Sequence, residues 1–274
     1  MVNLLPVQIS VVQRLVISLI DPKAIVDINA EIADDVEIGP FSIIGPEVTI
    51  GSGTVIGSHV VMKGPVSIGK DNHIYQFSSI GEDPQDKKYA DEKTCLVIGD
   101  RNVIREFVTM HRGTLQDHAV TKIGNDNLFM AYTHVAHDCI IGNNIIMANG
   151  ASLAGHVHLD DNAILGGFTL VHQFTQIGTF SFAAMGSAIT QDIPPYVMVG
   201  GRPTRPHGIN SVGMERAGCR SEAVRLIRKA YKILYKNNLR MEDAIEEVED
   251  LAGDCDEISN MVSFLRNVSR GILR

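Results

Sequence analysis

The chain has 274 residues, of which 45% are hydrophobic, 20% are charged and 5% are aromatic, and its formal net charge is −8. That length is ample for a sizeable buried core. The four cysteines (Cys95, Cys139, Cys219 and Cys255) form no CxxC motif and no paired spacing. We therefore exclude a disulfide framework and expect a reducing compartment, the cytoplasm.

Residues 1–19 precede the first repeated pattern. The apolar stretch 11–20 is interrupted by Gln13 and Arg14. It is shorter than the roughly 17–25 apolar residues that a membrane-spanning helix needs. The first ten residues carry no positive charge, unlike the start of a signal peptide. We expect a loosely packed extension over 1–19 and no integral membrane segment.

From residue 20 to residue 189, an apolar residue recurs at every sixth position, with breaks after residues 80 and 110 and a one-residue slip at the second break. We call these recurring apolar residues rungs. A helix turns by about 100° per residue, so rungs six residues apart would spread around its surface. Short strands that turn a corner every six residues match the period, and three such faces make one 18-residue coil. The pattern predicts a parallel β-helix over 20–193. Its rungs are Ile20, Val26, Ile32, Ile38, Ile44, Ile50, Ile56, Met62, Ile68, Ile74, Ile80, Ile98, Ile104, Met110, Ile123, Phe129, Val135, Ile141, Met147, Leu153, Leu159, Leu165, Val171, Ile177, Ala183 and Ile189.

Two segments interrupt the rungs, one at 81–97 and the other at 111–122. The first is rich in charge and contains Pro84. Polar segments without inward residues are expected to leave a solenoid as loops, and such loops often carry function.

The repeats end at Pro194 and Pro195, which we expect to stop strand pairing. Beyond them, an apolar stripe at helical spacing begins after Ser221, which is a suitable helix cap. Two further helices are expected, over 241–251 and 258–273. The sequence thus predicts a small helical C-terminal domain over 194–274.

Positive charge is concentrated in residues 201–240, which hold ten Lys and Arg residues but only Glu215 and Glu222 as acids. Such a segment is either a solvated helix face or a docking surface for an acidic partner. No aromatic residues alternate with the charges as a stacking surface for bases would need, so we expect no nucleic-acid partner.

Five of the ten histidines fall between residues 134 and 172. Because residues one coil apart stack on each other, His137, Gly155 and Gln173 form one column, and Asp138 stacks on His156. An imidazole beside a carboxylate is suited to general-base catalysis. A glycine N–H can approach a developing oxyanion closely. The column therefore predicts acyl transfer without a covalent enzyme intermediate.

Two alternatives use the same segment. Cys139 lies two residues from His137 and would share its side of a regular strand, so it is a candidate nucleophile or a small buried residue. His134, His137 and His156 would supply three nitrogen ligands for zinc, as in hexapeptide-repeat carbonic anhydrases. The zinc alternative gives Gly155 and Gln173 no role and leaves the basic C-terminal segment unexplained.

Seven short motifs resemble those of the UDP-N-acetylglucosamine O-acyltransferase family, and the resemblance runs from about residue 20 to residue 274. It implies a left-handed helix, which the six-residue period does not determine, and a homotrimer with active sites between subunits. The motifs are Ile-Gly-Pro-Phe (38–41), Ile-Tyr-Gln-Phe (74–77), His-Arg-Gly-Thr (111–114), His-Val-Ala-His-Asp-Cys (134–139), Leu-Ala-Gly-His (153–156), Val-His-Gln-Phe (171–174) and Pro-Pro-Tyr-Val (194–197).

The reaction implied by this resemblance is the first step of lipid A synthesis. An R-3-hydroxyacyl group moves from acyl carrier protein to the 3-hydroxyl of UDP-N-acetylglucosamine, with no further cofactor and no metal. By motif match, His137 is the general base, Asp138 orients it, and the Gly155 N–H is the oxyanion donor. The matching substrate positions are Gln85, Asp86, Lys88, His111, His134, His156, His172, Gln173, Asn210 and Arg216.

The match is looser at two positions. Arg216 lies between Glu215 and Ala217, in a segment that is often more basic in the family. We therefore expect the carrier protein to contact Arg216 together with Arg220, Arg225, Arg228, Lys229 and Lys232. The position that limits acyl length in the family corresponds to Met185, so we expect chains of about ten carbons to fit best. Met185 as ordinary flexible packing is the alternative.

Two other interpretations of the whole chain remain. The N-acyltransferase that acts later in the same pathway carries an extra N-terminal domain, which the extension over 1–19 is too short to form. A non-catalytic or metal-binding hexapeptide scaffold is the other interpretation, and zinc analysis separates it from the acyltransferase. A 3-amino sugar nucleotide as acceptor also remains open.

Overall fold

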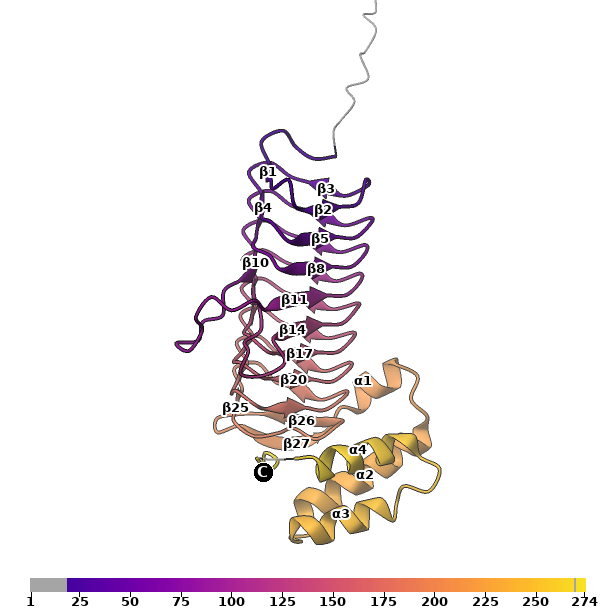
Figure 1. The fold of residues 1–274 in the computed structure, drawn as a ribbon. Coiled ribbons are helices and arrows are strands. Elements are labelled where there is room, and N and C mark those ends of the chain that lie inside the picture. Colours follow the sequence, from indigo (N-terminus) through magenta and orange to yellow (C-terminus); the bar gives the residue numbers. More distant parts are fainter. Residues whose placement is uncertain (1–18, 269) are drawn as a thin grey trace, which may run out of the picture.

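The computed structural model describes residues 19–268 and 270–274. They form a left-handed parallel β-helix with a triangular cross-section, followed by helices packed at its C-terminal end (Figure 1). This confirms the predicted fold class. Apart from Leu19, the predicted extension over 1–19 lies outside the described residues.

Each coil contributes one short strand to each of three sheets. The first sheet contains β1 (Ile25–Val26), β4 (Ile43–Ile44), β7 (Val61–Met62), β10 (Ser79–Glu82), β13 (Thr109–His111), β16 (His134–Val135), β19 (Ser152–Leu153), β22 (Leu170–Val171) and β25 (Ala188–Ile189). The second contains β2 (Glu31–Ile32), β5 (Val48–Ile50), β8 (Val66–Ile68), β11 (Cys95–Ile98), β14 (Val120–Ile123), β17 (Ile140–Ile141), β20 (His158–Leu159) and β23 (Gln176–Ile177). The third contains β3 (Glu37–Ile38), β6 (Val55–Ile56), β9 (His73–Ile74), β12 (Val103–Ile104), β15 (Leu128–Phe129), β18 (Ile146–Met147), β21 (Ile164–Leu165), β24 (Phe182–Ala183), β26 (Val197–Gly200) and β27 (Arg205–Ile209).

The six-residue rungs form the core of the prism. Ile56, Ile74 and Phe129 are at most 1% exposed. Regular coils pair in parallel, rung on rung, as Ile44 pairs with Met62. Each inward side chain therefore lies directly above the one in the coil below.

Both interruptions are insertions at one edge of the prism, where the chain passes from the first sheet to the second. Val66 pairs with Leu96, not with position 84 one regular coil later, so twelve residues are inserted between β10 and β11. Val103 pairs with Leu128, not with position 121, so seven are inserted between β13 and β14. The expected breaks at 81–97 and 111–122 were too wide, because their ends belong to paired strands. The unpaired loops are 83–94 and 112–119.

The same edge is lined by residues with positive φ. Asp138, His156 and Phe174 have φ values of 58°, 62° and 62° and follow one another on successive coils. Left-handed backbone at a non-glycine residue is uncommon and turns the chain sharply. These corner residues therefore project side by side along the edge.

The prolines at 194 and 195 do not end strand pairing, contrary to expectation. They occupy a corner, and β26 then pairs in parallel with β24. The next strand, β27, runs antiparallel to β26 and forms the last strand of the third sheet. Proline lacks an N–H, but a corner needs no ladder hydrogen bond at that position.

The helices are α1 (Ser211–Arg216), α2 (Ser221–Lys236), α3 (Met241–Glu249) and α4 (Asp256–Arg266). Ser221 is not the cap of α2: the cap position is Arg220, with no side-chain hydrogen bond. The last helix ends at Arg266, not at residue 273, because the final residues return to the prism, where the Leu273 N–H donates to the Asp192 carbonyl. Among the described residues, no helix is long and apolar enough to cross a membrane.

Candidate active site

A pocket of about 720 Å3 opens at the edge between the first and second sheets. The two inserted loops lie over this edge, and the corner residues of the coils below form its floor. It is lined by Gln85, Asp86, Lys87, Lys88, Gln116, Asp117, His137, His156, Gln173 and Phe174. Six of the predicted site residues therefore meet here: Gln85, Asp86, Lys88, His137, His156 and Gln173.

His137 and Asp138 form a hydrogen-bonded pair. The distance from His137 Nδ1 to Asp138 Oδ2 is 2.8 Å, and the Asp138 side chain is 1% exposed. Thr114 also donates to Asp138, from its N–H at 2.8 Å and from its hydroxyl at 2.6 Å. Burial raises the pKa of Asp138, but the hydrogen bonds from His137 and Thr114 outweigh it and hold this pKa below its usual value. Asp138 is therefore an ionised, fixed acceptor for the His137 ring.

Gly155 lies directly against His137, as the column of stacked coils predicts. A Cβ at position 155 would come within 2.5 Å of His137 Cε1 and 2.7 Å of Nε2. Only glycine leaves room for the imidazole at this point. Among the described residues, the Gly155 N–H donates no hydrogen bond, whereas its carbonyl accepts from Phe174.

His156 is held between three neighbours. Its Nδ1 is 2.7 Å from Asp117 Oδ2 and 3.9 Å from Asp138 Oδ2. Its ring stacks on Phe174, with centroids 4.2 Å apart. The predicted stacking of Asp138 on His156 is confirmed, and Asp117 is an additional partner.

His134 and His111 lie side by side on the first sheet, and neither lines the pocket. Their rings meet edge to face at 5.1 Å, and His134 Nδ1 is 2.7 Å from the Thr109 hydroxyl. Burial, followed by the charge of His134, lowers the pKa of His111 to about 4. Burial also lowers the pKa of His134. Both rings are therefore neutral near pH 7.

The nucleophile alternative fails on geometry. Cys139 is fully buried, and its thiol faces the Ala154 carbonyl inside the prism. Burial raises its pKa to about 12. Strand alternation does not extend from His137 to Cys139, because the left-handed backbone of Asp138 turns the chain between them.

The three-histidine zinc set is not assembled. The described ligand atoms close enough to share a metal come from His137, Asp138 and His156, without His134. In this group, each histidine Nδ1 already has a carboxylate partner.

Like His111 and His134, four further predicted site residues do not line this pocket. Asn210 caps α1, accepting from the Gly213 N–H and donating to the Phe180 carbonyl. Arg216 ends the same helix and is exposed. Met185 is 79% exposed at the edge between the third and first sheets. His172 is exposed beside Gln173, with its Nδ1 3.0 Å from the Gln173 carbonyl oxygen.

Sequence reasoning missed Thr114, Asp117 and Arg270. Arg270 donates to the Gln173 carbonyl at 2.7 Å, although it lies 97 residues further along the chain. Thr114 belongs to the His-Arg-Gly-Thr motif, which was a usable signal. Asp117 and Arg270 lie outside the repeats, so counting by coils does not place them.

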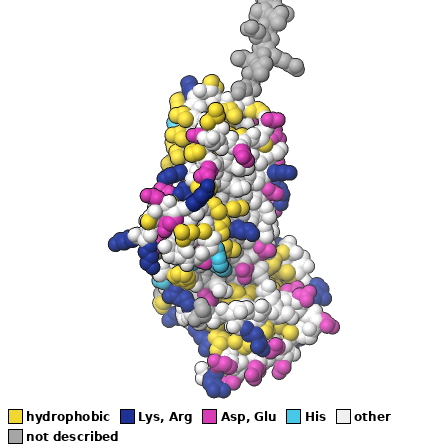
Figure 2. Space-filling view, viewed as in Figure 1, with side chains coloured by type: hydrophobic (Ala, Val, Ile, Leu, Met, Phe, Trp, Pro, Cys, Tyr) yellow, Lys and Arg dark blue, Asp and Glu magenta, His cyan; other side chains and the backbone are white. Residues whose placement is uncertain are grey.

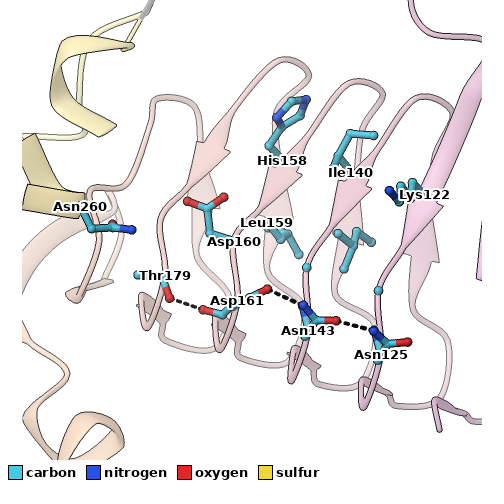
Figure 3. Close-up of a pocket in the computed structure, with 13 residues that line it drawn as sticks. Lys122, Asn125, Ile140, Asn143, His158, Leu159, Asp160, Asp161, Thr179 and Asn260 are labelled. Carbon is cyan, nitrogen blue, oxygen red and sulfur yellow. Dashed lines mark hydrogen bonds between the residues drawn. The ribbon is translucent and has the colours of Figure 1, made fainter. Parts of the chain in front are cut away.

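A second hollow, of about 630 Å3, lies over the second sheet and reaches Asn260 of α4 (Figure 3). A ladder of side chains runs along its edge: Asp161 accepts from Asn143, which in turn accepts from Asn125 (Figure 3). These bonds tie successive coils together. The catalytic candidates do not line this hollow.

Comparison with known proteins identifies the family of this chain. The family model described as "Udp N-acetylglucosamine O-acyltransferase; Domain 2" matches residues 192–273, and the bacterial transferase hexapeptide model matches 29–64 and 121–155. A protein of Stutzerimonas stutzeri named acyl-[acyl-carrier-protein]–UDP-N-acetylglucosamine O-acyltransferase is 54% identical over 94% of this chain and all of its own length. The chain belongs to the UDP-N-acetylglucosamine O-acyltransferase family. It is therefore an acyltransferase.

Solved structures of this acyltransferase family superpose along the described fold. The Acinetobacter baumannii protein has a TM-score of 0.91 and 46% identity, and the match covers 93% of this chain and 100% of that one. The Arabidopsis UDP-N-acetylglucosamine acyltransferase has a TM-score of 0.78 and 34% identity over 93% and 100% of the two chains. The family assignment thus rests on the prism and the helical end together.

Proposed function

We propose that this acyltransferase moves an R-3-hydroxyacyl group from acyl carrier protein to the 3-hydroxyl of UDP-N-acetylglucosamine, the first step of lipid A synthesis. The names of its close relatives support this reaction. The observation that carries it is the His137–Asp138 pair. The His137 ring lines the pocket and packs directly against Gly155, whose N–H donates no hydrogen bond among the described residues.

The proposed mechanism uses these three groups in sequence. His137 donates its Nδ1–H to Asp138, which leaves the lone pair of Nε2 to accept the proton of the attacking sugar hydroxyl. The hydroxyl oxygen bonds to the thioester carbonyl carbon, and the Gly155 N–H stabilises the resulting oxyanion. The carbon–sulfur bond then breaks, and the departing phosphopantetheine thiolate takes the proton from His137. No enzyme acyl intermediate and no further cofactor are needed.

The loop 83–94 supplies polar side chains over this centre. Gln85, Asp86 and Lys88 face the same pocket as His137. We propose that they bind the nucleotide sugar, together with His156, His172 and Gln173. His111, which is buried, and His134, which is half-buried, lie together on the first sheet, and we propose that they too contact the substrate.

A homotrimer would complete the site. The outer face of the first sheet exposes Ile25, Ile43, Val61 and Leu170, between 39% and 64% each. Figure 2 shows hydrophobic side chains gathered over the first coils on this side. A column of aromatic rings follows the edge between the third and first sheets. There, the ring centroids of Phe77, Phe107 and Tyr132 lie 4.8–5.1 Å apart in successive stacked pairs. Apolar surface of this extent favours burial against another subunit.

The predicted residues that lie away from the pocket fit the same assembly. We propose that Asn210 and Arg216 reach the pocket of a neighbouring subunit, and that Met185 limits the acyl groove between subunits. Met185 in this role favours chains of about ten carbons.

The basic helix is proposed to dock the acyl carrier protein. Arg225, Arg228, Lys229 and Lys232 occupy one face of α2 and are exposed, whereas its apolar face is buried. Arg220, at the N-cap of α2, and Arg216, at the end of α1, are also exposed, and we propose that they belong to the same docking surface. Such clustered charge favours an acidic partner.

One assay tests the reaction. Carrier proteins loaded with C10, C12 or C14 3-hydroxyacyl groups are offered to the wild type and to His137→Ala, with UDP-N-acetylglucosamine or its 3-amino analogue as acceptor. We expect ester formation, a preference for C10, and a loss of about 10²–10⁴ in kcat/KM for His137→Ala. Near wild-type turnover by His137→Ala would remove the base assignment. A clear preference for C14 would show that Met185 does not limit the acyl chain. Turnover of the 3-amino analogue alone, which yields an amide, would show that the acceptor is a 3-amino sugar nucleotide and not UDP-N-acetylglucosamine.

A further inference from the structure

The loop 112–119 is hydrogen-bonded to His156 and to Asp138, the partner of His137. Near its start, Thr114 binds Asp138 through its N–H and its hydroxyl. The Thr114 carbonyl then accepts from the N–H groups of Asp117 and Ala119, which closes a tight turn. The turn places the Asp117 carboxylate 2.7 Å from His156 Nδ1.

The contact with Asp117 determines which nitrogen of the His156 ring carries the proton and which one faces the pocket. A carboxylate only accepts hydrogen bonds, so Nδ1 carries the proton and Nε2 is left for the pocket. The His156 side chain is 11% exposed, and Phe174 covers one face of its ring. Asp117 and Phe174 together define both the direction and the tautomer of the imidazole.

The carboxylate of Asp138 is a competing acceptor for His156, and the contact with Asp117 keeps His156 from using it. Asp138 Oδ2 lies 3.9 Å from His156 Nδ1, beyond hydrogen-bond distance, and 2.8 Å from His137 Nδ1. If Asp117 were absent, the Nδ1–H of His156 would have Asp138 as its nearest charged acceptor. It would then compete with His137 for the same oxygen.

We propose that Asp117 is a positioning residue that holds His156 toward the substrate and away from the His137–Asp138 pair. The role rests on the proposed acyltransferase reaction, and it adds to it the loop that organises the pocket. Asp117 itself touches neither the reacting atoms nor Asp138 in this scheme. Asp117 also lines the pocket and lies 3.2 Å from His118 Nε2, but in this scheme its effect on the reaction passes through His156.

The test is a double-mutant cycle. Wild type, Asp117→Ala, His156→Ala and the double variant are compared in kcat and KM for UDP-N-acetylglucosamine. We expect Asp117→Ala to lower kcat/KM roughly tenfold, and the double variant to be no worse than His156→Ala, because coupled residues are not additive. Asp117→Asn should retain most activity, since its amide oxygen still accepts from Nδ1–H. Equal losses from Asp117→Ala in both backgrounds would overturn the proposal.

Two controls separate this proposal from other causes. Asp126→Asn removes a carboxylate that pairs with Arg101 on the surface, and it should leave kinetics unchanged. Histidine ring NMR of the protein without substrate should show Nδ1-protonated His156 in the wild type and a changed tautomer signal in Asp117→Ala. Wild-type protein that shows this signal but no acyl transfer would reject the proposed function while keeping the positioning role. An unchanged His156 signal in Asp117→Ala would reject the positioning role.

Discussion

At the scale of single residues, His111 links the structure to pH. Its ring is 3% exposed and its Nδ1 has no hydrogen-bond partner among the described residues. Its pKa is lowered from 6.5 to about 4. Between these values the unfolded chain binds a proton that the folded chain does not, so the free energy of unfolding falls as pH falls.

We expect replacement of His111 to remove this dependence. From pH 7 to pH 5 the wild type should lose roughly 2 kcal/mol more stability than His111→Gln. Urea unfolding of both proteins at pH 7 and pH 5 measures this difference in the free energy of unfolding. Both proteins are used at equal concentration, because the apparent stability of an oligomer depends on concentration. Equal losses of stability in the two proteins would show that the pH dependence does not come from protonation of His111.

The residues of the column were predictable because repeats convert sequence distance into spatial distance. Counting by whole coils placed Gly155 on His137 and His156 on Asp138 without any side-chain information. The same counting could not find Asp117 or Arg270, whose positions depend on chain segments outside the coils. Strand alternation, not counting, suggested that Cys139 shares the side of His137. The left-handed backbone of Asp138 turns the thiol inward, so of the two alternatives the small buried residue is confirmed.

At the scale of elements, Arg112 joins the long loop to the prism. Its side chain is 5% exposed, and it donates to the Gly81 carbonyl at 2.6 Å and the Gly64 carbonyl at 3.1 Å. Further bonds reach the Asp83 carboxylate and the Tyr89 hydroxyl. One guanidinium thus holds both ends of the segment that carries Asp86 and Lys88.

Arg112→Lys should release this loop, because a lysine ammonium cannot make the planar, forked contacts. We expect trypsin to cut after Lys87 or Lys88 roughly tenfold faster than in the wild type, as expected for a locally opened segment. Arg101→Lys, which alters an exposed pair with Asp126, is the matched control. Indistinguishable cleavage in the two variants would assign the order of the loop to other contacts.

The sequence predicted where the two loops interrupt the repeats, but not at which residues each loop begins and ends. Hydrophobic rungs report only which residues point inward, so the paired ends of β10, β11, β13 and β14 were included in the breaks. The insertion lengths of twelve and seven become visible only through the register of the coils on either side. Helix ends were misplaced for a similar reason, since the final residues pair with the prism instead of continuing α4.

At the scale of the whole molecule, the separation of His137 from Arg216 makes subunit exchange informative. Neither His137→Ala nor Arg216→Ala subunits should form fully active sites alone. In mixed assemblies of the proposed trimer, about one interface in four joins an intact His137 to an intact Arg216, so roughly a quarter of the wild-type rate should return.

The mixture is prepared by denaturing and refolding the two variants together, with sedimentation velocity to establish the trimer. Each variant refolded alone is the control. A mixture no more active than the sum of its parts would place both residues in the site of the same subunit, or Arg216 outside the site.

The location of both insertions on one edge has a consequence for the shape of the ligand. Five successive turns along that edge carry the loop 83–94, the loop 112–119, His137, His156 and Phe174. With about 4.8 Å between neighbouring strands, those turns span roughly 19 Å along the prism axis. A molecule that touches all of them must be long and narrow and must lie parallel to the axis. Selectivity then depends on molecular length, and a compact molecule of equal volume would leave part of the edge exposed to water.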